Sequence, residues 1–314
     1  MWTCRGYDTM KVKKQETIQN TEVSAKKWGL AAACMGNVIW GFTYLFTRIA
    51  MREASPMVIL AVRFDITFLL LLLMVLSGRW QVSYRGKKVG WLLFFSILEP
   101  LYFFFESYCI YYTNATYAGV ALAIAPILSI FLGALFLKEY PTRHQAVFSI
   151  FPVVGVILIT MVGQRLGFVR PIGILFLFFT CLTSALNKPA NRRSAEQFTP
   201  FERTFMMILI SAAAYTGAVL VLLKGNVKEL VRPLAVPGFL IPVLILSIVS
   251  SIGANMLINY AAGKLSVTMM ATAGALCTLC SMFAGVIFLG EPMTVVSFIG
   301  SLLVLIGIWQ VAKE

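Results

Sequence analysis

Beyond Lys27 the chain alternates long apolar segments with short polar linkers. An apolar helix of about 20 residues is long enough to cross the hydrocarbon core of a bilayer. Ten segments meet this length, near 29–50, 57–77, 89–112, 115–137, 145–163, 171–191, 203–223, 238–260, 266–289 and 294–312. The pattern therefore predicts an all-α integral membrane protein with ten transmembrane helices.

The composition changes which partners are plausible. Hydrophobic residues make up 59% of the chain and charged residues only 12%, whereas a soluble domain carries about 25% charged residues. The net charge of +13 would also suit a nucleic-acid partner, but the basic residues gather at the ends of the apolar segments, where they orient a membrane protein. We therefore expect the lipid bilayer, and no nucleic acid, as a partner.

The distribution of Lys and Arg predicts the orientation. If the amino terminus is cytoplasmic, 18 basic residues fall in inside segments and 7 in outside loops, with Arg63 within a span. The positive-inside rule then predicts a multi-pass protein of the cell (cytoplasmic) membrane with both termini in the cytoplasm. Residues 1–27 form a basic tail without an apolar core or a small-residue cleavage site, so we expect no cleaved signal peptide.

The spans repeat within the chain. A shift of 152 residues places "FLKEYPT" (136–142) on "FLGEPMT" (288–294) and Gly155 on Gly307, and a shift of 144 places Arg48 on Arg192. Each half, 28–163 and 164–314, then has five spans, and an odd number turns the second half upside down. Inverted repeats are a transporter architecture in which the substrate site lies near mid-membrane between the halves.

Four stretches carry a resemblance to a known family: "WGFTYLFTRIA" (40–50), "SPMVILAVRF" (55–64), "YYTNATYAGVALAIAPILSIFLGALFLKEYPT" (111–142) and "GEPMTVVSFIGSLLVLIGI" (290–308). Together with the ten-span inverted repeat, they resemble the EamA-type branch of the drug/metabolite transporter superfamily. The resemblance covers about 90% of the chain, everything except the tail. It implies two five-helix EamA-like repeats around a central cavity, and members of the family move amino acids, other metabolites and drugs across membranes.

Two carboxylates stand out in the third apolar segment. Glu99 and Glu106 are seven residues apart, which puts them on one helical face together with Tyr102. That face cannot turn to lipid, so it should line the bundle interior or a wet cavity. Arg63 and Glu106 lie at about the same depth, which allows an ion pair. Such a pair could bind substrate, or it could only tie the second and third spans together.

Proton coupling is the second role that we assign to these carboxylates. Glu99 lies near mid-span, and no basic residue is evident at its depth, so it is the better candidate for a proton carrier. Glu106, beside Arg63, is expected to stay charged and to set the polar end of the site.

Other polar side chains within the spans extend the candidate substrate site. Trp40 and Tyr44 follow helical spacing on the first span, Asn187 interrupts the sixth, and Asn255 and Asn259 form a polar stripe on the eighth. Interhelical hydrogen bonding explains each of these positions nearly as well as cavity lining does. For the neighbouring Lys188 we expect a side chain that snorkels to the cytoplasmic surface.

The same sequence argues against an enzyme. We find no metal-ligand spacing, no set of nucleophile and base, and no phosphate loop, so no cofactor and no metal are expected. Cys277 falls where the first half has Ala125, which suggests a small packing residue. The prediction is a secondary transporter, acting as a monomer or homodimer, that exports a small polar or aromatic metabolite by alternating access. A membrane-embedded enzyme, a non-transporting sensor and a channel remain the alternatives.

Overall fold

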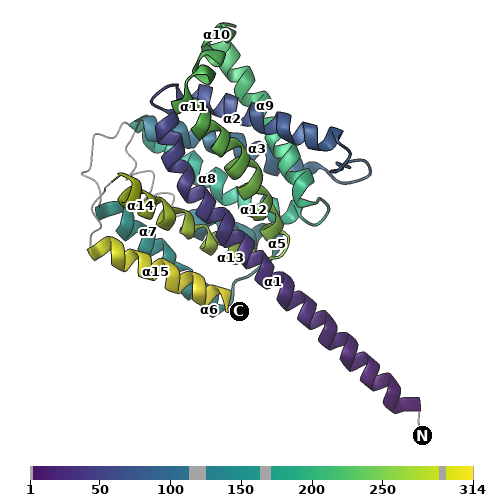
Figure 1. The fold of residues 1–314 in the computed structure, drawn as a ribbon. Coiled ribbons are helices and arrows are strands. Elements are labelled where there is room, and N and C mark those ends of the chain that lie inside the picture. The colour runs from purple at the N-terminus through teal and green to yellow at the C-terminus, as the bar shows by residue number, and fades with distance from the viewer. Residues whose placement is uncertain (1–2, 113–124, 163–170, 290–294, 314) are drawn as a thin grey trace.

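The computed structural model describes residues 3–112, 125–162, 171–289 and 295–313, and these residues are folded almost entirely into helices (Figure 1). The elements are α1 (Thr3–Ala50), α2 (Pro56–Leu76), α3 (Gly90–Tyr112), α5 (Ala125–Leu137), α6 (Arg143–Phe148), α7 (Ile150–Val162), α8 (Pro171–Ser194), α9 (Pro200–Leu222), α10 (Val227–Val231), η1 (Arg232–Ala235), α11 (Pro237–Ile245), η2 (Leu246–Ala254), α12 (Asn255–Ala262), α13 (Val267–Ala273), α14 (Ala275–Leu289) and α15 (Val295–Ala312). The first part of the span predicted at 115–137, and the 290–294 part of the repeated motif, lie outside the described residues.

Five described segments are long and apolar enough to cross a membrane: Val23–Thr47, Pro56–Leu76, Pro171–Ser194, Pro200–Leu222 and Pro237–Ala262. Shorter apolar helices lie at Ala125–Leu137, Arg143–Leu158, Val267–Cys277 and Phe298–Ala312. The protein is therefore an all-helical, membrane-embedded protein with several passes.

Local sequence explains where several helices begin. Thr199 caps α9 by accepting from the Glu202 amide, and the Glu202 side chain accepts from the Thr199 amide in return. Pro200 follows at the first helical position, where a missing N–H costs nothing. Serine and proline likewise precede and open α2, at Ser55 and Pro56.

Some helices differ from the predicted spans. The helix α1 begins at Thr3 and not near residue 29. The span predicted at 238–260 is one continuous helical segment whose middle, η2, is a π-helix. In the span predicted at 266–289, α13 ends before Gly274 and α14 begins at Ala275.

The helices pack pairwise in the bundle of Figure 1. Contacts join α3 to α8, α2 to α9, α7 to α15, α5 to α8, and α1 to α14 and to α11, η2 and α12. The contact between α7 and α15 is tight, because a methyl group added at Gly155 would collide with Gly300 and Val304, and one added at Gly307 would collide with Pro152. Small residues thus allow two backbones to approach each other, as is common in membranes.

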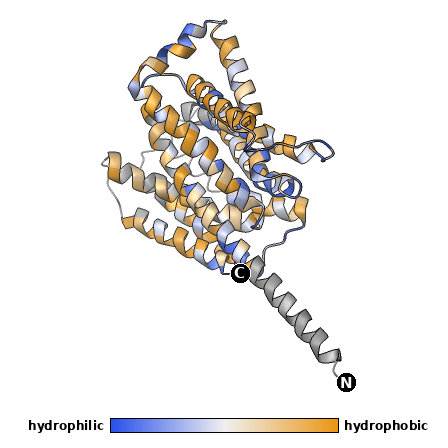
Figure 2. Cartoon of the chain, turned by 45° about the vertical axis from the view of Figure 1, so that its right-hand side comes forward, coloured by the Kyte–Doolittle hydropathy of each residue, from blue (hydrophilic) through white to orange (hydrophobic). Residues whose placement is uncertain are grey.

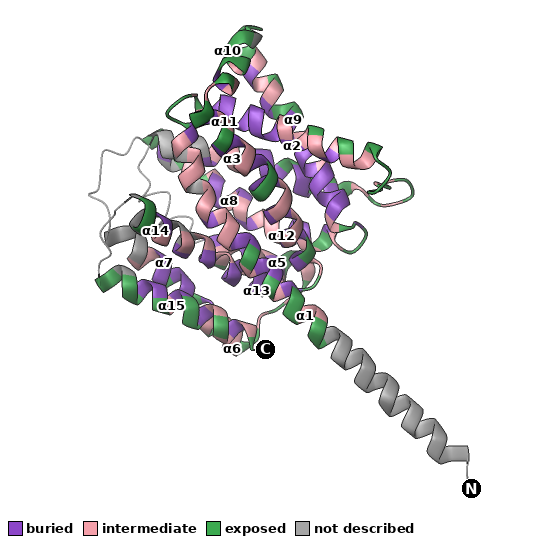
Figure 3. Ribbon diagram, in the orientation of Figure 1, coloured by how far each residue is buried: buried purple, intermediate pink, exposed green. Residues whose placement is uncertain are grey.

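The outward faces of the bundle are apolar (Figure 2). Figure 3 colours the ribbon by burial, with exposed residues in green. The exposed apolar residues include Leu73, Phe131 and Ile287 at 61%, 64% and 70% exposure. Buried polar and charged residues such as Arg63 and Glu106 face inward. A bilayer would cover the apolar faces, and the charges are kept away from lipid.

Candidate functional site

A cavity of about 260 Å³ lies between the helices, and four of them line it with one face each. The lining positions follow the three- and four-residue spacing of a helical face. They are Asn37, Trp40 and Thr47 on α1, Pro56, Ile59, Leu60 and Arg63 on α2, Glu99, Tyr102, Phe103 and Glu106 on α3, and Ser184, Asn187, Lys188 and Asn191 on α8. Residues of α5, α7, α12, α13 and α14 complete the wall.

The cavity reaches one end of the bundle. Its lining runs from Asn191, deep in the bundle, to Met51 and Pro56 at the turn between α1 and α2. Met51 is 38% exposed at that turn. Because α2 starts at this end, the connection that follows its last residue, Leu76, lies at the opposite end.

Arg63 is a charged residue of the cavity lining, is only 4% exposed, and is held by contacts with neighbouring helices. Its Nε donates to Ser251 Oγ at 2.7 Å, and one terminal nitrogen donates to Ser250 Oγ at 2.9 Å. Both serines belong to the π-helical η2. The guanidinium carbon also lies 5.3 Å from the centre of the Phe103 ring, which adds a cation–π contact.

The two carboxylates of α3, Glu99 and Glu106, each accept a hydrogen bond, and both interact with Arg63. The Tyr102 hydroxyl donates to Glu106 at 2.6 Å, and the Asn187 amide donates to Glu99 at 3.0 Å. Arg63 interacts electrostatically with both Glu99 and Glu106. The prediction that Glu99 has no basic residue nearby is therefore wrong, since helix packing brings α2 to both carboxylates.

The sixth predicted span, α8, differs from the prediction at Lys188. Ser184, Asn187, Lys188 and Asn191 occupy one helical face, and that face lines the cavity. Lys188 is partly exposed. Its cavity position contradicts the expectation of a side chain that only snorkels to the surface.

The other predicted site residues divide into two groups. Trp40 on α1 and Tyr102 on α3 line the cavity, and so does Cys277, for which only a packing role was expected. The side chain of Tyr44 lies outside the part of the structure that is described. Asn255 and Asn259 are not among the lining residues. The Asn255 amide donates to the Ser251 carbonyl within its own helix.

Asn259 belongs to a buried network at the deep end of the cavity. Its side chain donates to Thr204 at 2.8 Å and accepts from the Asn191 amide at 2.8 Å. Arg203, 1% exposed, donates to the Asn191 side chain at 2.5 Å and to the Asn259 carbonyl. The network ties α8, α9 and α12 together beneath the cavity, so Asn259 has a packing role here. Arg203 was not predicted as a member of this network, although an arginine inside an apolar helix is itself a signal.

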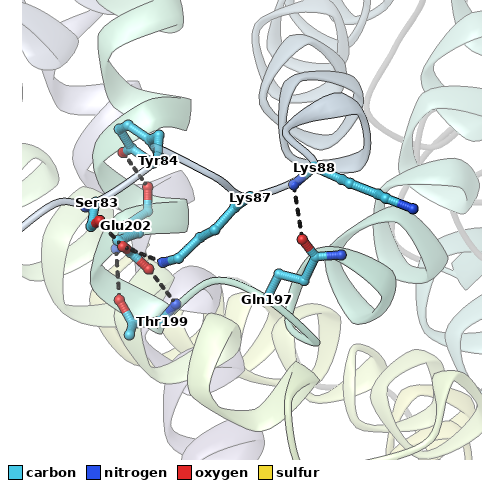
Figure 4. Close-up of polar contacts among 7 residues, drawn as sticks. All are labelled: Ser83, Tyr84, Lys87, Lys88, Gln197, Thr199 and Glu202. Atoms are coloured by element: carbon cyan, nitrogen blue, oxygen red, sulfur yellow. Dashed lines mark hydrogen bonds and ion pairs between the residues drawn. The ribbon is translucent and has the colours of Figure 1, made fainter.

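The end of the bundle opposite to Met51 is closed by contacts between segments far apart in the sequence (Figure 4). Glu202, 3% exposed, accepts from the Ser83 amide at 2.9 Å and from Lys87 Nζ at 2.8 Å. The Tyr84 hydroxyl donates to the Glu202 carbonyl at 2.9 Å. Burial and the Glu202 charge raise the pKa of the Tyr84 phenol, so it stays a donor at any physiological pH.

Three further contacts strengthen this end. The Lys88 amide donates to Gln197 at 2.9 Å (Figure 4). Glu139, directly after α5, pairs with Arg192 of α8 at 3.1 Å and accepts from the Val267 amide at the start of α13 at 3.1 Å. The linker after α2 and the end of α5 are thus fastened to α8, α9 and α13.

The described residues around the cavity do not form a metal site. In the part of the chain that the structure describes, no group of three or more His, Cys, Asp or Glu side chains converges on one point. The polar groups of the cavity are instead those of a binding site, with charges of both signs and aromatic walls.

Comparisons with known proteins decide the family. The sequence model of the EamA-like transporter family matches residues 27–161 and 171–312. The chain belongs to the EamA-like transporter family. The resemblance inferred from the four sequence stretches is thereby confirmed, and the family indicates that this EamA-like protein is a membrane transporter.

Relatives of this EamA-like transporter carry the same general description. One is the uncharacterized transporter YcxC of Bacillus subtilis, 30% identical over 88% of this chain and 90% of the relative. Another, an uncharacterized transporter of Archaeoglobus fulgidus, is 25% identical over 92% and 99% of the two chains. A protein of known crystal structure shares the fold, with a TM-score of 0.72 and 18% identity over 92% of this chain and 98% of its own.

Proposed function

We propose that the protein is a secondary transporter that exports a small polar or aromatic metabolite by alternating access, coupled to protons. The observation that carries the proposal is the cavity itself. Charged groups of both signs line a space within the apolar bundle, and the lining extends to the exposed Met51 at one end, whereas polar contacts hold distant segments together at the other. Charges inside a membrane are retained where they bind substrate or ions.

The ten-helix inverted repeat predicted from the sequence is part of this proposal, because it would provide the symmetry that alternating access needs. Under the exchange of halves, Gly155 corresponds to Gly307, and the residues that crowd them, Val304 and Pro152, correspond to each other as well. The helix contacts have the same symmetry. The contact of α3 with α8 has its counterpart in that of α1 with α11, η2 and α12, and α2 and α7 contact their own counterparts, α9 and α15.

Rocking of such repeats against each other would alternately open the two ends. The contacts of Glu202 with Lys87 and of Glu139 with Arg192 all join the first half to the second. They would therefore have to break when the closed end opens. The pair of Glu139 with Arg192 is partly exposed on both sides, and ion pairs that water can reach contribute little to stability, which suits a gate.

The charge bias of the sequence assigns the two ends. With both termini in the cytoplasm of a cell-membrane protein, the closed end faces the cytoplasm and the turn at Met51 faces outside. The structure then corresponds to an outward-open state. A metabolite released from this state leaves the cell.

Labelling of Cys277 tests both the cavity and its orientation. In a variant whose single cysteine is Cys277, a membrane-impermeant thiol reagent added to intact cells is expected to react, because Cys277 lines the cavity. The matched control keeps only Cys280, on the same helix α14 but not on the lining, and is expected to react much more slowly. Reaction of Cys277 only after permeabilisation would reverse the assigned orientation.

Transport itself is tested by comparing metabolites inside and outside cells. Cells that make the wild-type protein are compared with cells that make Glu106→Gln at the same level. A transporter predicts one class of compounds that is depleted inside, enriched in the medium and dependent on Glu106. Saturable export would separate it from a channel, and unchanged metabolite pools would favour a sensor instead.

A further inference from the structure

Lys188 is the one charged side chain of the described cavity lining for which the structure shows no hydrogen bond or ion pair. Arg63 is held by two serines, Glu106 by Tyr102 and Glu99 by Asn187. Lys188 lies on the same helical face as Asn187, one position further along α8. Adjacent helical residues point about 100° apart, so Lys188 leaves the helix in a different direction from the amide that holds Glu99.

An ammonium group kept from bulk water without a partner is unfavourable. Lys188 is only partly exposed, and it lies on the wall of the cavity. The simplest compensation is an anion that enters the cavity. A lysine is a compact point charge with three donors, and it suits a singly charged oxygen anion on a small molecule.

We propose that Lys188 binds the carboxylate of the transported metabolite. The proposal rests on the proposed transport function and specifies the chemistry of its substrate. The aromatic side chains Trp40, Tyr102 and Phe103 line the same cavity and can contact an apolar portion of the molecule. If the substrate carboxylate binds at Lys188, Arg63 and Glu106 are available to contact the remaining polar groups of the substrate.

Protection of Cys277 measures this interaction without any flux. In purified protein whose single cysteine is Cys277, benzoate is expected to slow modification by an uncharged maleimide, whereas benzamide, with the same shape and no charge, protects much less. Lys188→Met is expected to raise the half-protecting benzoate concentration by roughly tenfold or more, the size of one charge-assisted hydrogen bond. Lys188→Arg should keep most of the protection, because it keeps the charge.

The matched control is Lys264→Met, which removes an exposed lysine outside the cavity lining and should leave protection unchanged. Equal protection by benzoate in wild type and Lys188→Met overturns the proposal, and so does the absence of protection in wild type. If inorganic phosphate protects and benzoate does not, and if this protection is lost in Lys188→Met, the carboxylate proposal is wrong and the site binds a phosphate group instead. Lys188-dependent binding without metabolite export would refute transport and leave the anion site in place.

Discussion

Arg63→Ala is expected to abolish transport and to destabilise the protein by about 3–5 kcal/mol, the usual cost of removing one partner from a buried charge group. The guanidinium compensates Glu99 and Glu106 electrostatically and joins α2 to η2 through two serines. Without it, two carboxylates remain in an apolar bundle with no cation between them. Thermal unfolding in detergent, with export measured in parallel, provides the test.

Three matched variants separate the causes. Ser251→Ala removes one hydrogen bond to Arg63 and should cost only about 1 kcal/mol. Arg63→Lys keeps the charge but loses the planar guanidinium group whose nitrogens reach both serines. We therefore expect an intermediate loss of stability. Adding Glu99→Gln to Arg63→Ala should restore about 0.5–3 kcal/mol, a coupling that is typical of interacting groups. Purely additive losses would mean that Arg63 and Glu99 do not interact.

The sequence was sufficient to turn the charged side chains toward the bundle interior, because the bilayer allows few alternatives. Arg63, Glu99 and Glu106 cannot face lipid, so their helical faces must turn toward the bundle interior. The regular spacing of α3 then brings Tyr102 and Phe103 to the same face. In physical terms, the exclusion of charges from lipid and the helical period determine which side chains face the cavity in this part of the site.

The same reasoning failed where the helix is irregular. Ser251, Asn255 and Asn259 form a stripe only if the segment has an α-helical period, and Leu246–Ala254 is a π-helix. The wider turn lets Ser250 and Ser251 both reach Arg63, and it leaves Asn255 bonded within its own helix. Single-sequence spacing gives no sign of such a turn, which is frequent at functional sites.

Contacts between distant segments were also beyond the sequence. The linker around Lys87 looked like an orientation signal, and its ion pair with Glu202 depends on how α2 and α9 pack. Lys188 shows the same limit, because only the rotation of α8 decides whether the side chain reaches the surface or the cavity. Periodicity predicts faces, and helix packing decides what each face meets.

Glu99→Gln is expected to separate transport from the proton gradient, because Glu99 and Glu106 share one nearby cation, Arg63. Arg63 carries one positive charge, and Glu99 and Glu106 together carry two negative charges when both are ionised. Binding one proton brings this group to neutrality, which lowers the cost of keeping it inside the membrane. Glu99 is 8% exposed and lines the cavity, so a proton can reach it through water in the cavity.

Liposomes that contain the purified protein and the substrate found by the metabolite comparison provide the measurement. If one proton moves per substrate, wild-type protein should accumulate substrate by about tenfold per unit of pH gradient, equivalent to 1.4 kcal/mol. Glu99→Gln should lose this accumulation and still exchange labelled for unlabelled substrate at equal pH. The control is Glu106→Gln, which removes the negative charge from the group that accepts the Tyr102 hydroxyl and should raise the concentration needed for half-maximal exchange. Unchanged gradient dependence in Glu99→Gln would move the proton site elsewhere, with Glu106 as the next carboxyl to test.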